Sequence, residues 1–223
     1  AYELEGGYSK YLLEMMQAEE ESSTDRKADI ERSIQKKFHK ELFSKFAKAI
    51  NTYDLLQEGD KVAVCISGGK DSMLMAKLFQ EIKRHNKFQF ELVFLVMDPG
   101  YSPMNRQVIE NNAKIMGIPL TIFESNIFEA VYEIEKSPCY LCARIETILM
   151  GMLYGGQVQT MMPKLHSSNF EGMELIRPLY LIREDDIKKW RDYNDLHFIQ
   201  CACRFTDTCT TCREDGSVGS KRM

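Results

Sequence analysis

The chain has 223 residues, of which 44% are hydrophobic and 10% aromatic. It is long enough to bury a substantial core, which excludes a disordered tail and a small disulfide-stabilised peptide. No uninterrupted apolar run approaches the ~20 residues of a membrane-spanning helix, and the net charge of -4 lacks the positive balance of a general nucleic-acid coat. We expect a globular protein with no membrane partner and only local contacts to nucleic acid.

The first predicted element is an amphipathic, basic helix over residues 29–53, which lies within a predicted N-terminal helical segment over residues 1–55. Apolar side chains recur there every fourth residue, and lysines lie largely off this stripe. The stripe consists of Ile30, Ile34, Phe38, Leu42, Phe46 and Ile50. The lysines indicate either an ordinary solvated face or a surface that binds a phosphate backbone.

From Lys61 onward, short apolar runs alternate with helical patterns. Strands are predicted at 62–67, 90–97 and 119–124, and helices at 70–83, 105–116 and 128–135. This alternation is typical of an α/β protein with a doubly wound parallel sheet and right-handed crossovers. A helix at 145–154, a strand-like run at 174–181 and a helix beginning near Arg183 are predicted to follow.

The strongest chemical signal is a glycine-rich turn between the first strand and the next helix. Its residues are Ser67, Gly68, Gly69, Lys70, Asp71 and Ser72. Two glycines let the backbone approach an anion closely, and a helix N-terminus presents free N–H groups. The two serines add hydroxyl donors, Lys70 supplies positive charge and Asp71 can hold Mg²⁺. The lysine directly follows the glycines, so the spacing is not that of a γ-phosphate-transferring P-loop.

Seven cysteines lie in a chain whose first residues lack the features of a secretory signal. We therefore expect a cytoplasmic protein, in which clustered cysteines bind metal more often than they form disulfides. The clusters are Cys139 with Cys142, Cys201 with Cys203, and Cys209 with Cys212. Such spacing fits zinc, a redox pair or an iron–sulfur cluster. Cys65, on the first strand, is expected to pack in the core.

The turn after the first strand resembles the PP-loop of the ATP pyrophosphatases. The resemblance implies that ATP is cleaved between its α- and β-phosphates and that the adenylyl group activates a carbonyl oxygen. It also implies that Ser67–Ser72 hold ATP and Mg²⁺, with Lys70 and Asp71 as catalytic residues. The adenine would lie by the ends of the first two strands, near Cys65, Ile66, Val96, Met97 and Asp98.

A joint pattern over residues 30–203 resembles the TtcA-like tRNA 2-thiocytidine synthetase family. Besides the PP-loop it comprises Pro138-Cys139-Tyr140-Leu141-Cys142, Leu153-Tyr154-Gly155-Gly156, Met162-Pro163-Lys164, Ile176-Arg177-Pro178-Leu179 and Arg183-Glu184-Asp185-Asp186-Ile187. The resemblance implies a 4Fe-4S cluster held by Cys139, Cys142 and Cys201, with Cys203 as a rival third ligand. One iron would then be free to carry sulfide. Zinc, with His197 or the last cysteine pair as ligands, stays open as the alternative.

The implied reaction adenylates the C2 oxygen of a tRNA cytidine, at position 32 of the anticodon loop, and replaces that oxygen with sulfur. The implied partners are tRNA and a cysteine desulfurase or other sulfur donor. An apolar patch on the helix at 29–53 or at 145–154 would in addition indicate a homodimer. Candidates for contacts with the tRNA backbone are Lys36, Lys37, Lys40, Arg177 and Arg183. Two alternatives stay open: thiolation of a uridine or of a non-tRNA acceptor, and a non-catalytic nucleotide-binding iron–sulfur or zinc protein.

The chain departs from this family between Arg144 and Ile145, where its members have a further helix, a strand and a histidine-containing segment. We expect a numbering gap there rather than a deleted strand, because loss of a core strand would be costly. The predicted PP-loop domain covers residues 56–200, and a cysteine-rich segment covers 201–223.

Overall fold

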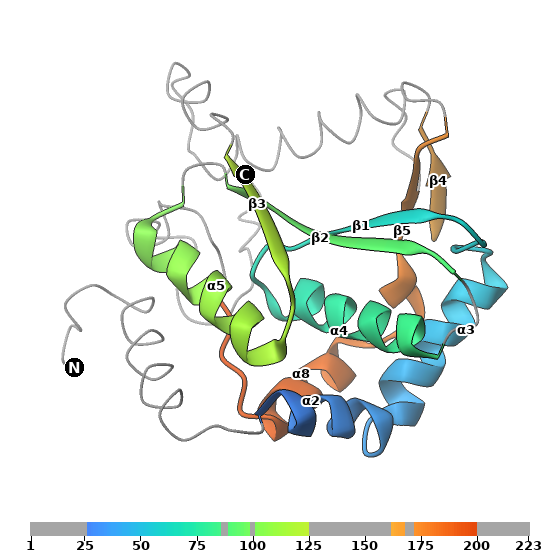
Figure 1. Cartoon of the computed structure of the whole chain (residues 1–223). Helices are drawn as coiled ribbons and strands as arrows, with labels where there is room; N and C mark the ends of the chain where they lie inside the picture. The colour runs from blue at the N-terminus through green and yellow to red at the C-terminus, as the bar shows by residue number, and fades with distance from the viewer. Residues whose placement is uncertain (1–25, 86–88, 99–100, 125–161, 168–171, 200–223) are drawn as a thin grey trace, which may run out of the picture.

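The computed structural model describes residues 26–85, 89–98, 101–124, 162–167 and 172–199 (Figure 1). The predicted helices at 128–135 and 145–154, the expected gap after Arg144 and all three cysteine clusters lie outside these residues. Within the described ranges, none of the helices has the length and apolar character needed to cross a membrane.

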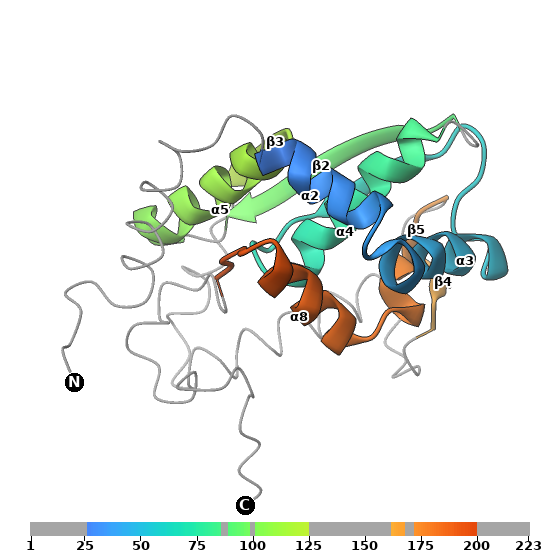
Figure 2. The same ribbon diagram turned by 90° about the horizontal axis from the view of Figure 1, so that it is seen from below.

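Three parallel strands form the central sheet, in the order β1 (Lys61–Cys65), β2 (Glu91–Asp98) and β3 (Leu120–Glu124). Helix α4 (Lys70–Arg84) connects the first pair of strands and α5 (Pro103–Met116) connects the second. Figures 1 and 2 show both helices on one side of the sheet, with α2 and α8 packed beneath them as a third layer. The predicted α/β class and parallel sheet are confirmed. The second half of a doubly wound sheet is not among the described residues.

The core lies between the sheet and its helices. Along β2 the side chains alternate, so that Phe94 and Val96 are buried against the helical layer while Val93 and Met97 are exposed on the other face. The expected core packing of Cys65 is wrong, because the residue at the end of β1 is exposed.

The prediction of one continuous helix over residues 29–53 is wrong. The chain forms α2 (Arg26–Gln35), a turn, the π-helix η1 (His39–Phe43) and α3 (Ser44–Thr52). A four-residue repeat on a helix with 3.6 residues per turn rotates by about 40° at each step. A straight α-helix would therefore carry the later apolar residues away from the core. A wider turn, with a 2.9 Å hydrogen bond from Phe38 N to Ser33 O, corrects the rotation, and the whole predicted stripe is buried.

The last described part contains a hairpin and two helices. β4 (Lys164–His166) pairs antiparallel with β5 (Glu174–Ile176). The predicted strand over 174–181 is wrong beyond Ile176, because Pro178 lacks an N–H for a sheet ladder and begins the 3₁₀-helix η2 (Pro178–Leu181). Helix α8 (Glu184–Tyr193) begins directly after Arg183, as predicted.

A buried ion pair ties α2 to the helical layer. The ammonium group of Lys77 on α4, whose side chain is 1% exposed, lies 2.8 Å from Glu31 Oε1 and donates to the Met116 carbonyl oxygen. Arg84 contacts the second oxygen of Glu31 at 2.8 Å. At the other side of α2, the indole N–H of Trp190 donates to the Ser33 hydroxyl. Helix α2 is therefore packed on both α4 and α8.

Candidate functional site

The glycine-rich turn predicted to bind phosphate lies between β1 and α4. Gly68 has φ +82°, a backbone conformation that residues with a side chain rarely adopt. There is also no space for a side chain, because an added Cβ would lie 2.6 Å from Ile109 Cγ1 and 2.7 Å from Ile199 Cδ1. The structure thus requires glycine at this position for two independent reasons.

Serine hydroxyls fix the shape of the turn from inside. The hydroxyl of Ser72 donates to the Gly69 carbonyl oxygen at 3.0 Å and accepts from Ser67 N at 3.3 Å. The two serine oxygens are 3.2 Å apart. Gly69 serves as N-cap of α4, so the free N–H groups at the start of this helix follow the turn directly. This geometry is suited to holding an anion.

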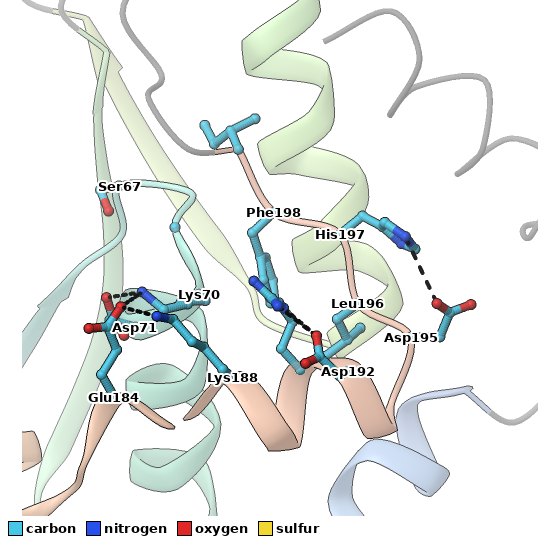
Figure 3. A pocket seen from close by; sticks show the side chains of 13 residues that line it. Ser67, Lys70, Asp71, Glu184, Lys188, Asp192, Asp195, Leu196, His197 and Phe198 are labelled. Atoms are coloured by element: carbon cyan, nitrogen blue, oxygen red, sulfur yellow. Dashed lines mark hydrogen bonds and ion pairs between the residues drawn. The ribbon is translucent and has the colours of Figure 1, made fainter. Parts of the chain in front are cut away.

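A cavity of about 580 Å³ opens beside the turn (Figure 3). One wall consists of the turn and the start of α4. The opposite wall consists of α8 and the segment that follows it. The lining residues on α8 share one side of the helix, because the second lies four residues after the first and the last two lie three and four residues further on, whereas Ile187 and Trp190 are buried in the core. They are Glu184, Lys188, Arg191 and Asp192.

The charges in the cavity are paired with one another. Lys70 Nζ lies 3.2 Å from Asp71 Oδ2 and 3.4 Å from Glu184 Oε1. Lys188 Nζ lies 3.2 Å from the same Glu184 oxygen. Hydrogen bonds from Lys188 and Lys70 hold the pKa of Glu184 below its ordinary value, so this carboxylate is charged at neutral pH. Figure 3 shows the two ammonium groups converging on Glu184.

The segment after α8 brings residues 195–199 to the turn. Asp195 has a positive φ of 49° and turns the chain, and Asn112 on α5 donates to the His197 carbonyl oxygen at 3.0 Å. Phe198 and Ile199 are buried, and Ile199 packs against Gly68. The described chain therefore reaches the phosphate loop two residues before Cys201.

Asp98 lies at the same edge of the sheet as the turn but does not line the cavity. Its carboxylate accepts from Tyr101 N at 2.7 Å and lies 3.3 Å from the guanidinium of Arg106. Ile66 and Val96 are buried, whereas Met97 is exposed.

The basic residues predicted to contact the tRNA backbone lie at several places in the structure. Lys37 Nζ is 3.4 Å from the centre of the Tyr193 ring, at the end of α8. Arg177 donates to the Met162 carbonyl oxygen, and Arg183 lies 3.6 Å from Asp185. Lys36 and Lys40 are exposed.

The predicted cluster ligands Cys139, Cys142, Cys201 and Cys203 lie outside the described residues. Within those residues, no group of three or more His, Cys, Asp or Glu side chains is placed to hold a metal ion. His197, the alternative zinc ligand, has its Nε2 atom 3.9 Å from Asp195 Oδ1.

Sequence reasoning missed the α8 wall of the cavity. The signal was present, since the charged residues of α8 recur with helical spacing opposite a buried isoleucine and tryptophan. The position of this wall against the turn was not predictable, because it depends on packing between segments that are far apart in the chain.

Curated relatives named tRNA-cytidine(32) 2-sulfurtransferase align with the chain over 195 residues, and the alignment covers 74% of the chain. The relative from Cellvibrio japonicus is 30% identical, and that from Burkholderia cenocepacia is 27% identical. The chain spans only 64% and 59% of the length of these two proteins. No protein-family model matches the chain.

Among solved structures, the U34-tRNA thiolase from Methanococcus maripaludis, with its 4Fe-4S cluster, is similar to the chain with a TM-score of 0.51 and 21% identity. The similarity covers 75% of this chain and 67% of that one. It confirms the predicted fold. The chain is thus similar in sequence to the tRNA-cytidine(32) 2-sulfurtransferases and in fold to a tRNA thiolase, as its motifs predicted.

Proposed function

We propose that the chain is an ATP-dependent sulfurtransferase, which replaces the C2 oxygen of cytidine 32 in tRNA with sulfur. The observation that carries this proposal is the packing of Ile199 on Gly68, two residues before Cys201. Two residues of chain span about 7 Å at most. A sulfur-carrying site that includes Cys201 would therefore lie within reach of a nucleotide bound at the phosphate loop.

In the proposed reaction, ATP binds with its phosphates at Ser67–Ser72. The C2 oxygen of the base attacks the α-phosphorus, and pyrophosphate leaves. Lys70 and the N–H groups at the start of α4 stabilise the negative charge that develops on the pyrophosphate. The carboxylate of Asp71, whose side chain is 54% exposed beside Lys70, is available to hold Mg²⁺. A sulfur nucleophile then adds to C2, and AMP leaves with the oxygen.

We assign the sulfur-carrying site to Cys139, Cys142 and Cys201, with Cys203 as the rival third ligand. A 4Fe-4S cluster held by three thiolates would supply an iron that is open to sulfide. A cysteine desulfurase is the proposed source of sulfur. We also propose that the protein acts in the cytoplasm, that it is a homodimer and that residues 56–200 form the catalytic domain.

A uridine substrate is the second candidate, because the solved structure with a similar fold is a U34-tRNA thiolase. Mass spectrometry of nucleosides from tRNA incubated with the protein, ATP and a sulfide source distinguishes 2-thiocytidine from a thiolated uridine.

The decisive test of the proposal is the release of pyrophosphate from ATP with and without tRNA. We expect release to depend on tRNA and to accompany formation of 2-thiocytidine. Protein that carries an intact cluster but releases no pyrophosphate would instead be a nucleotide-binding regulator.

A further inference from the structure

A single carboxylate oxygen of Glu184 lies between two ammonium groups at the phosphate loop. Its Oε1 atom is 3.4 Å from Lys70 Nζ and 3.2 Å from Lys188 Nζ. Lys70 is the first residue of α4, and Lys188 lies one turn into α8, so the two cations come from opposite walls of the cavity. The protein thereby holds one anionic oxygen at the point where these cations meet (Figure 3).

The helix dipole alone does not explain the contacts of Glu184. Acidic residues are favourable in the first turn of a helix, and α8 has three of them. Asp185 lies 3.6 Å from Arg183, and Asp186 lies 2.8 Å from Lys45. Of these three acids, Glu184 alone lines the cavity and contacts the phosphate loop.

The side chain of Glu184 is both charged and free to move. Its interactions with the two lysines favour the ionised form, which carries negative charge on oxygen as a phosphate does. The side chain is 62% exposed, so it can rotate out of the cavity without opening the core. The Lys188 side chain is 47% exposed and ends a flexible stem that can follow a new partner.

We propose that Glu184 occupies the position of a phosphate oxygen, and that Lys188 is a second phosphate ligand which the carboxylate keeps beside Lys70. This inference rests on the proposed function, since it names how that site receives a nucleotide polyphosphate or pyrophosphate. On binding, a phosphate oxygen displaces the carboxylate and takes over both ammonium contacts. Glu184 therefore competes with the ligand, whereas Lys188 binds it.

The test is isothermal titration calorimetry of the full chain with two magnesium-bound probes, pyrophosphate and an ATP analogue with a methylene group between its α- and β-phosphates. Glu184→Gln keeps the size of the side chain and removes the competing charge. We expect both probes to bind about fivefold more tightly, because each exposed ion pair has a modest free energy. Lys188→Met should weaken binding of both about tenfold, because a charge-assisted contact is lost. Lys189→Met, at an exposed position that does not line the cavity, is the matched control and should change little.

Tighter binding by Glu184→Gln and weaker binding by Lys188→Met together distinguish competition with phosphate from a purely structural role of Glu184. If Glu184 only positions the lysines, Glu184→Gln weakens binding and the inference is wrong. Equal affinities of Lys188→Met and Lys189→Met also overturn it, while binding by the wild-type chain leaves the proposed function standing. A folded wild-type chain that binds neither probe overturns both. Effects on the ATP analogue but not on pyrophosphate would place the contact at the α-phosphate and contradict a pyrophosphate site.

Discussion

The side chain of Ile199 fills the space beside the α-carbon of Gly68. A Cβ on Gly68 would lie 2.7 Å from Ile199 Cδ1 and 2.6 Å from Cγ1 of Ile109 on α5. The shape of the phosphate loop therefore depends on a residue from the C-terminal part of the chain.

Gly68→Ala is expected to destabilise the protein through two effects. The positive φ costs about 1–2 kcal/mol with a side chain present, and crowding against Ile109 and Ile199 adds about 1–3 kcal/mol. Gly59→Ala is the matched control, because Gly59 has φ +85° but an added Cβ would meet nothing within 4 Å. Urea unfolding should show a clearly larger loss for Gly68→Ala. Equal losses would mean that the contact with Ile199 does not constrain the loop.

Glu31→Gln should cost about 3 kcal/mol of unfolding free energy, because it leaves the buried ammonium of Lys77 without a charged partner. The exposed pair of Asp29 and Arg32 provides the control, since both side chains are more than half exposed. Asp29→Asn should change the free energy of unfolding by less than about 1 kcal/mol. A similarly small effect at Glu31 would show that water reaches Lys77.

The contribution of Glu31 should also depend on pH. Burial alone would raise its pKa, but Lys77 and Arg84 outweigh burial and hold the pKa below the ordinary value of 4.5. A carboxyl with a lower pKa in the folded state stabilises the protein fully above its unfolded pKa and loses this effect as the pH falls through the folded pKa. The difference in stability between wild type and Glu31→Gln should thus be largest near neutral pH and shrink below about pH 4.5. A constant difference in urea unfolding across this range would contradict the assignment.

Cys139→Ala and Cys201→Ala should each abolish the brown absorbance of an iron–sulfur cluster while ATP binding survives. Asp71→Ala should do the reverse, retaining the absorbance and losing turnover. Cys65→Ala is the control, because it also removes one thiol, at an exposed position at the end of β1, and it should leave the absorbance unchanged. Anaerobic absorbance spectra, with iron and sulfide content, measure the cluster. Unchanged spectra in both ligand variants would exclude these cysteines as ligands.

The sequence predicted the central α/β elements closely, because the apolar residues of each element recur with a clear period and capping or turn residues mark its ends. Helix α5 begins at Pro103 after the N-cap Ser102 and ends at Met116, before the C-cap Gly117, whose φ is +65°. The prediction of one helix over 29–53 is wrong because a stripe with a four-residue period looks continuous in sequence, although an α-helix can follow it only with a wider turn. Exposure of Cys65 was also missed, since a short strand does not reveal which of its faces is covered.

The candidate site was predictable on one side only. The phosphate loop is a local arrangement of glycine, serine and lysine, so the residues that form it are adjacent in sequence. The opposite wall depends on how α8 packs, and no local pattern specifies that Glu184 meets Lys70. Charges on one face of α8 showed that this face is polar, but not that it faces the loop.

The ion pair between Lys77 and Glu31 has a consequence for any shortened form of the protein. The counter-charge for an ammonium group inside the helical layer comes from a helix that precedes the sheet in the chain. A fragment beginning at β1 would keep every residue of the phosphate loop, yet it would lose the carboxylate that pairs with the Lys77 ammonium group. Helix α2 thus supplies the counter-ion for a lysine of the helix that begins at the phosphate loop.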